Sequence, residues 1–178
     1  AGGDLSAINP DPNSMFWRMP ENFSTRNIRD AYLKGGSPLH KGIVVSFPTG
    51  KVYYDGVRVS QSKPKLDVYI RNADGKKVEY KIKFGKELHS DSTAGALAVA
   101  LGYSADITQR VANVKIVLGE TTSAELKQDW ASYYVRDDFT FPWRIEDYIK
   151  SEGRDEEGNY IIFTEGVFEA KPKELLRV

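Results

Sequence analysis

The chain has 178 residues, the usual length of one domain or of two small ones. Its 25 basic and 25 acidic side chains balance to a net charge of zero, which argues against nucleic acid as a partner because duplex-binding proteins usually carry a basic excess. The chain contains no cysteine, so disulfides, thiolate metal sites and cysteine nucleophiles are excluded.

The chain is expected to start with an irregular segment. Residues 1–22 form this lead-in, because the Asn-Pro-Asp-Pro-Asn run at 9–13 favours turns. Residues 23–178 are expected to form a single α+β domain. Ser24 is expected to cap a short helix that ends at the Gly-Gly pair 35–36.

Strands are predicted next, at 42–47 and 51–59. Apolar and polar residues then alternate at 66–71 and 78–84, on either side of the Asp-Gly pair 74–75. Two such runs around Asp-Gly predict a β-hairpin with one buried face.

A helix capped by Ser90 and ended by Gly102 should follow the hairpin. Its predicted core-facing stripe has helical spacing and consists of Ala94, Leu97, Ala98 and Leu101. The small residues in this stripe predict that the helix packs closely on the sheet. We expect the hairpin and this helix to share one core that includes Val68, Ile70, Tyr80, Ile82, Phe84, Leu97 and Leu101.

The remaining predicted elements lie between residue 114 and the carboxyl terminus. Thr122 and Glu125 have the spacing of a capping box, which predicts a helix to about Tyr134. We also expect a strand at 114–118, an aromatic loop at 139–143, short helical turns at 144–150, a charged surface loop at 152–159 and a strand at 160–170. The predicted fold is therefore α+β: a twisted antiparallel sheet of about five strands, one closely packed helix, and a helical, aromatic C-terminal section.

One candidate site for a phosphate-bearing ligand consists of Lys81, Lys83, Glu87 and Asp91. Alternation places both lysines opposite the buried Ile82. A lysine on a strand, held by an acid on the next helix, presents a cation to nucleotide phosphates in kinase-type small lobes. We expect Lys83 on the concave face of the sheet, within salt-bridge reach of Glu87 or Asp91. The alternative is a solvent-facing strand whose lysines deter edge pairing.

The stretch 81–103 resembles the amino-terminal part of a family of mostly uncharacterised, often exported bacterial proteins. It shares a strand ending in Lys-x-Lys-aromatic-Gly, an acid, and a helix closing on Leu-Gly-Tyr. That part of the family is similar to the small lobe of HipA-like atypical kinases. The resemblance covers about 110 residues and implies a small-lobe-like core at about 40–120. It also implies that Lys83 faces phosphate and that Asp91 is the helix acid.

Two departures from this resemblance concern chemistry. The helix acid of the family is usually Glu, so the shorter Asp91 makes Glu87 the substitute partner of Lys83. The sequence shows neither a catalytic-loop Asp with a downstream Asn nor an Asp-Phe-Gly motif, and no catalytic residue is assigned. Whether the chain is an enzyme is left open. ATP with Mg²⁺ is expected as a cofactor only if a large lobe completes the site, and that lobe or a protein partner is the expected binding partner.

An aromatic cluster is the second candidate site: Trp130, Tyr133, Tyr134, Phe141 and Trp143. Such clusters anchor protein partners or build a satellite core beneath a loop, and the core interpretation is favoured here. The alternative function is therefore a non-catalytic exported binding or interaction domain.

Metal binding and membrane insertion are not expected. His40 and His89 lie 49 positions apart, without the paired spacing of a zinc site. The longest apolar run, 94–103, is shorter than the roughly 20 residues of a membrane span. The chain starts Ala-Gly-Gly-Asp without Met, so a trimmed start is expected, and a periplasmic or secreted location is favoured over the cytoplasm.

Overall fold

The computed structural model describes residues 25, 47, 50–57, 65–85, 88–103, 105–106, 108–134 and 144–170. The chain divides into two compact units: residues 47–92 with 108–171 form one, and residues 1–46, 93–107 and 172–178 form the other. The predicted lead-in, most of the helix after Ser24, the strand at 42–47 apart from Phe47, and the aromatic loop at 139–143 lie outside the described residues.

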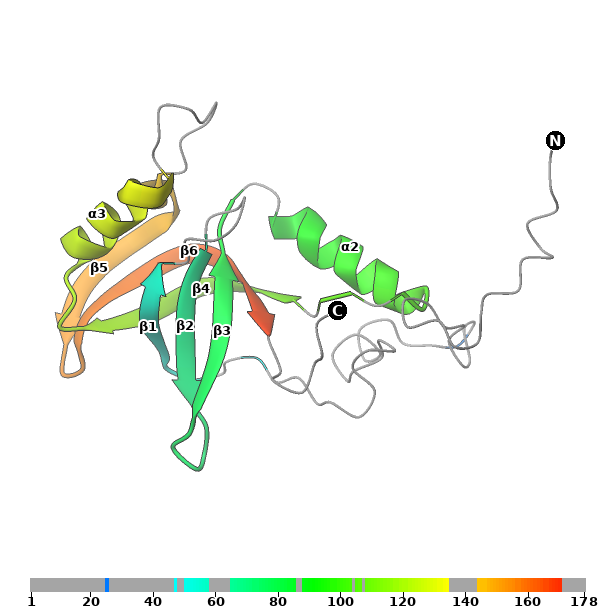
Figure 1. Cartoon of the computed structure of the whole chain (residues 1–178), viewed down its shortest axis with the longest axis horizontal. Helices are drawn as coiled ribbons and strands as arrows, with labels where there is room; N and C mark the ends of the chain where they lie inside the picture. The colour runs from blue at the N-terminus through cyan, green and yellow to red at the C-terminus, as the bar shows by residue number, and fades with distance from the viewer. Residues whose placement is uncertain are drawn as a thin grey trace. The chain divides into compact units, whose positions relative to one another are not determined.

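The described elements are strands and a few helices (Figure 1). The strands are β1 (Val52–Val57), β2 (Lys65–Arg71), β3 (Lys77–Lys83), β4 (Thr108–Gly119), β5 (Ile149–Asp155) and β6 (Gly158–Ala170). The helices are α2 (Leu88–Ala100), α3 (Ser123–Tyr134) and the 3₁₀ helix η3 (Ile145–Tyr148).

The sheet closes into a five-stranded barrel. Its strand order is β3-β2-β1-β4-β6, and an antiparallel pairing of β3 with β6 completes the circle. The predicted all-antiparallel sheet is wrong at one place, because β1 and β4 pair in parallel through Val52 with Ile116 and Tyr53 with Val117. This pairing joins segments about 60 residues apart, so no local turn signal marks it.

Strand β6 contacts three neighbouring strands. It pairs with β4 along one edge, while its other edge pairs with β5 at residues 158–163 and with β3 at residues 167–170. A single long strand therefore closes the barrel and also carries the additional strand β5.

The predicted hairpin is confirmed as β2 and β3, paired from Lys65–Lys83 to Arg71–Lys77. Gly75 adopts φ +74°, a left-handed conformation that glycine takes without a steric penalty. The Asn72 side chain organises the turn, since its Oδ1 accepts hydrogen bonds from the backbone N–H groups of Asp74 and Lys76 at 3.1 and 2.8 Å.

Apolar side chains of the strands fill the barrel. Leu66, Val68, Tyr80 and Ile82 are buried, as alternation within the hairpin predicts, whereas the predicted core residue Ile70 is only partly buried. Phe168 of β6 is almost fully buried as well. Phe163 and Gly166 of β6 both face the interior, although residues three positions apart lie on opposite faces of a regular strand. Phe163 contacts Phe84, and a Cβ on Gly166 would lie 2.6 Å from Ile82 Cγ2. At the same level Asn113 of β4 has φ +53°, which bends the strand although its register with β6 is unbroken there.

The predicted buried face of α2 is wrong. Leu97 and Leu101 are 53% and 41% exposed, whereas Leu88 and Val99 are buried. The helix also begins two residues before Ser90, the predicted cap. Half of the predicted stripe is alanine, and small residues are also frequent on the other faces of the helix, so the apolar periodicity indicated a buried face only weakly. The stop at Gly102 is confirmed by hydrogen bonds from the Gly102 and Tyr103 N–H groups to the Val99 and Ala98 carbonyls.

The capping box of α3 is confirmed. The Thr122 backbone N–H donates to Glu125 Oε2 at 2.7 Å, and the Glu125 N–H donates to Thr122 Oγ1 at 3.2 Å. Helix α3 packs against β1, β6 and η3. Its Trp130 is fully buried, with its ring 5.9 Å from Phe84 and 4.8 Å from Tyr134.

The predicted helical C-terminal section is wrong, because β5 and β6 occupy most of it. The stretch 152–159, predicted as a loop, forms the end of β5 and the start of β6. Its charged side chains lie on a strand that is largely exposed, so high polarity alone was a poor sign of a loop. The predicted helical turns at 144–150 correspond to η3.

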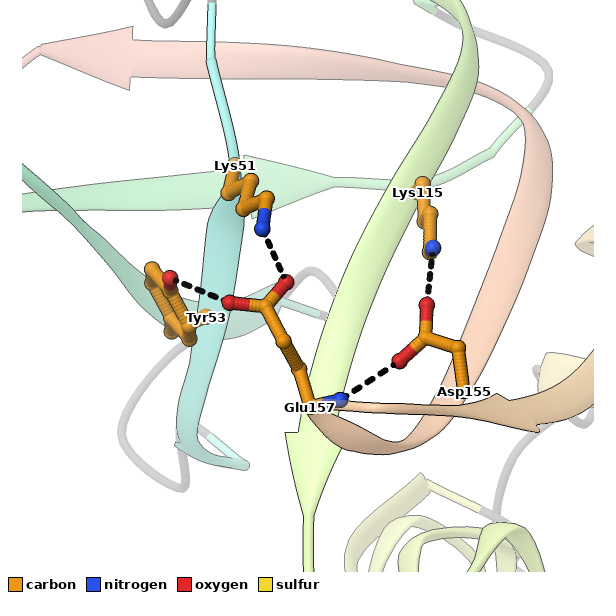
Figure 2. A network of polar contacts seen from close by, with 5 residues as sticks. All are labelled: Lys51, Tyr53, Lys115, Asp155 and Glu157. Carbon is orange, nitrogen blue, oxygen red and sulfur yellow. Dashed lines mark hydrogen bonds and ion pairs between the residues drawn. The ribbon is translucent and has the colours of Figure 1, made fainter.

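The turn between β5 and β6 is joined to β1 and β4 by charged side chains (Figure 2). Glu157 accepts from Lys51 Nζ at 2.7 Å and from the Tyr53 hydroxyl at 3.1 Å. Asp155 accepts from Lys115 Nζ at 2.6 Å and from the Glu157 backbone N–H at 2.9 Å. These contacts span the short parallel pairing of β1 with β4.

We expect this turn to make stability depend on pH. The hydrogen bonds from Lys51 and Lys115 lower the pKa values of Glu157 and Asp155 below their ordinary values of 4.5 and 3.8. A depressed folded-state pKa stabilises the fold above the unfolded-state pKa, and this contribution is lost as pH falls through the folded-state pKa. Thermal unfolding should therefore show a midpoint that falls below about pH 4.5, with a shallower fall in the double variant Glu157→Gln and Asp155→Asn.

The control for this experiment is Glu120→Gln. The Glu120 side chain is 93% exposed, and its nearest cation, Arg154, is 4.0 Å away. This variant should retain the wild-type slope. Equal slopes for the wild type and the double variant would show that these ion pairs do not couple protonation to folding.

Candidate functional site

The candidate lysines lie on the outer surface of the barrel. Lys83 is paired across the sheet with Lys65 of β2, and Lys81 is paired with Glu169 of β6. Directly paired residues project to the same face, so these side chains share the surface opposite Ile82. The prediction of a concave face for Lys83 is therefore wrong, because closure of the sheet makes this surface the outside of the barrel.

The central group of this surface is the Glu169 carboxylate. Its Oε2 lies 3.2 Å from Lys83 Nζ and 3.3 Å from Lys65 Nζ. Of the two acids predicted within reach of Lys83, Asp91 is in reach, with its Oδ2 3.7 Å from Lys83 Nζ, while Glu87 lies outside the described residues. We call Lys65, Lys81, Lys83, Asp91 and Glu169 the lysine cluster.

Three members of the lysine cluster are shielded from water. Lys65 and Lys81 are each 6% exposed and Glu169 is 2% exposed. Electrostatic interactions strengthen where water is excluded, and a buried charge requires a partner of opposite sign. Two ammonium groups on one carboxylate meet that requirement, and they also define a position where an anion is stabilised.

A second ion network continues along β6. Arg110 of β4 donates to Glu165 Oε2 at 2.8 Å through Nε, and His89 Nε2 lies 3.9 Å from Glu165 Oε1. The Arg110 and His89 side chains are more exposed than any in the lysine cluster, whereas Glu165 is about as exposed as Asp91. Acids and bases therefore alternate on this surface, and the lysine cluster is its most shielded part.

The remaining candidates are divided between the interior and the surface. Trp130 and Tyr134 are buried in the core, and Tyr133 on the same helix is exposed. Glu87, Phe141 and Trp143 lie outside the described residues. The structure thus contains a buried aromatic cluster, while a role of these residues in interaction stays a prediction.

An acidic cleft of about 600 Å³ lies beside helix α3. It is lined by Tyr54, Gly56, Glu120, Thr121, Glu125, Leu126 and Asp129. Burial raises the pKa of Tyr54 to about 12, with the nearby Asp129 contributing. The carboxylates make this cleft unfavourable for a phosphate, which would meet charges of its own sign.

Sequence reasoning missed Glu169 and the role of Lys65. Glu169 is 104 positions from Lys65, and no spacing rule connects two side chains at such a separation. The one available signal was the alternation of the last predicted strand, which assigns Glu169 to a face but not to a partner.

Among the described residues, no group of three or more His, Asp or Glu side chains is arranged to hold a metal ion. No helix in the described part of the chain has the length and apolar character required to cross a membrane. Comparisons of the chain with known protein families, with curated proteins and with solved structures find no match.

Proposed function

We propose that the chain is a kinase-like small lobe whose lysine cluster binds the phosphates of a nucleotide, without complete catalytic machinery of its own. The observation that carries this proposal is the position of Lys83. Its ammonium lies on a strand, 3.7 Å from an acid on the next helix, which is the arrangement used to present a lysine to ATP.

Two further features support the proposal. Lys65 and Lys83 both place an ammonium beside the Glu169 carboxylate. A phosphate that replaces this carboxylate, or binds next to it, would therefore meet two cations. The order of elements is also suitable, since the lysine strand β3 is followed directly by α2, which carries Asp91 in its first turn.

The proposal assigns distinct roles to the members of the cluster. Lys83 and Lys65 neutralise phosphate oxygens as point charges, and Asp91 restricts the position of the Lys83 ammonium. Phosphate transfer requires in addition a catalytic acid and metal ligands, which a large lobe would supply together with ATP and Mg²⁺.

Titration with ATP tests this function. We expect backbone amide resonances of β3 and β6 to shift saturably, with a dissociation constant in the millimolar range for an isolated lobe. Lys83→Gln should weaken binding about tenfold, because it removes one charge-assisted contact. Lys83→Arg, which keeps the charge, should retain much of the affinity.

The matched control is Lys77→Gln, which removes a lysine from the same strand. Lys77 lies 2.7 Å from Asp55 and 3.8 Å from Glu79, so its loss, like that of Lys83, removes ion pairs with two acids. ATP affinity should be unchanged in this variant. Equal weakening of ATP binding by both substitutions would show that the effect comes from the net charge of the chain and not from a specific site. The absence of a saturable shift up to about 10 mM ATP would exclude the proposed site.

A second candidate function is an exported binding or protein-interaction domain. It is favoured by exposed apolar side chains at the end of α2 and just beyond it, namely Leu97, Leu101 and Tyr103. The same titration separates the two functions. An interaction domain predicts no nucleotide-dependent shift at β3 and β6.

A further inference from the structure

We propose that a groove in the barrel wall between the start of β1 and the bend in β4 binds a small amphipathic anion, such as a carboxylate with an apolar chain. This groove is separate from the lysine cluster. Its volume is about 380 Å³, within the range of small-ligand sites.

The opening follows from strand pairing. Strands β1 and β4 are hydrogen-bonded at only two residue pairs, Val52 with Ile116 and Tyr53 with Val117. On the amino-terminal side of these pairs, β4 continues through Asn113, whose left-handed φ of +53° accompanies its bend. Non-glycine residues seldom adopt this conformation, and such positions occur often at ligand sites. The pairing of β1 with β4 therefore starts at Val52, beside the lining residues Gly50 and Lys51.

The floor of the groove is apolar. Val52, Val114, Val117 and Phe168 line it, and each is at most 4% exposed. Phe168 belongs to the barrel interior, where its ring makes an edge contact with Tyr80 at 6.2 Å. An apolar ligand chain in the groove would therefore contact core side chains, and its apolar surface would be removed from water.

The rim favours an anion. Two lysines, Lys51 and Lys115, and one acid, Glu157, line the groove. Asp155 pairs with Lys115 beside it, so these four charges balance, and the surplus cation of the rim is Lys150. Figure 2 shows both ammonium groups held by acids of the β5–β6 turn. An ammonium has three donors, and the bond from Lys115 to Asp155 uses one, so a ligand carboxylate can be added without displacing the acid.

A further cation lies at the same rim. Lys150 Nζ donates to Asn113 Oδ1 at 2.7 Å, a neutral acceptor, and Asn113 lines the groove. A carboxylate bound between Lys115 and Asn113 would gain this third ammonium as a neighbour. The head group is therefore expected at Lys115 and the apolar chain at Phe168.

Decanoate is the probe for the first test, with decanol as its neutral counterpart. In an amide-resonance titration of the full chain, decanoate should shift residues of β1 and the bend of β4 saturably. Decanol should bind at least about fivefold more weakly, because it lacks the charge that the rim lysines recognise. Equal binding of decanol, or no saturable shift with decanoate, would overturn the proposal.

Two substitutions locate the site. Gly50 lines the groove, a Cβ there would meet no described atom within 4 Å, and its φ is not in the left-handed region, so Gly50→Phe adds a bulky ring at the groove without backbone strain. It should abolish binding. Lys115→Gln should weaken binding about fivefold.

Lys77→Gln is the matched control for Lys115→Gln. The two side chains are 40% and 43% exposed, form ion pairs at 2.7 and 2.6 Å, and lie over the rings of Tyr69 and Tyr160. Lys77 does not line the groove. Binding that survives Gly50→Phe, or that falls equally in both lysine variants, would contradict the proposal. Should Gly50→Phe fail to fold, the comparison of the two lysine variants decides.

Discussion

Replacing Trp130 by alanine is expected to destabilise the fold by about 3–5 kcal/mol. The indole is fully buried on α3 and packs against Phe84 and Tyr134. Its loss removes the largest side chain of the buried aromatic cluster, and the backbone of a closed barrel has little freedom to fill the resulting cavity. Chemical denaturation with two probes measures the change in the free energy of unfolding.

Tyr133→Ala is the control, because Tyr133 lies on the same helix and is exposed. It should change stability by less than about 1 kcal/mol. A comparably small effect of Trp130→Ala would mean that the indole is a surface group available to a partner. The aromatic cluster would then be interpreted as an interaction site and not as part of the core.

Replacing Glu169 by glutamine is expected to cost about 3–5 kcal/mol, because it leaves two shielded ammonium groups without their shared carboxylate. Glutamine has nearly the same shape, so the change isolates the charge. Lys65 and Lys83 both lie within 3.3 Å of this carboxylate. Denaturation at neutral pH measures the loss.

Glu165→Gln is the matched control on the same strand. Glu165 is paired with Arg110 but is more exposed than Glu169, so its loss should cost less than about 1 kcal/mol. If the lysine cluster binds phosphate, ATP should stabilise the Glu169→Gln variant more than the wild type, since the ligand replaces the missing charge. Equal costs for the two variants would show that burial does not strengthen the Glu169 interactions.

Local signals in the sequence predicted the hairpin, the helix stop at Gly102 and the capping box of α3. The two helix signals depend on residues within about five positions of one another, and the hairpin on two runs joined by a short turn, so each is satisfied by residues close in the sequence. Alternation also predicted correctly that Lys83 lies on the face opposite the buried Ile82. The charged strand β5 was missed because its exposed side chains give no alternating pattern.

Only the tertiary structure decided the closure of the barrel and the composition of the lysine cluster. The parallel pairing of β1 with β4 and the contact of Lys65 with Glu169, 104 positions away, bring together segments with no local relationship. Alternation assigns each side chain to one of two faces, but the neighbours on that face depend on which strands pair. The sequence by itself therefore determined the hairpin and the orientation of Lys83, whereas the path of β6 past both β3 and β4 determined which acid Lys83 contacts.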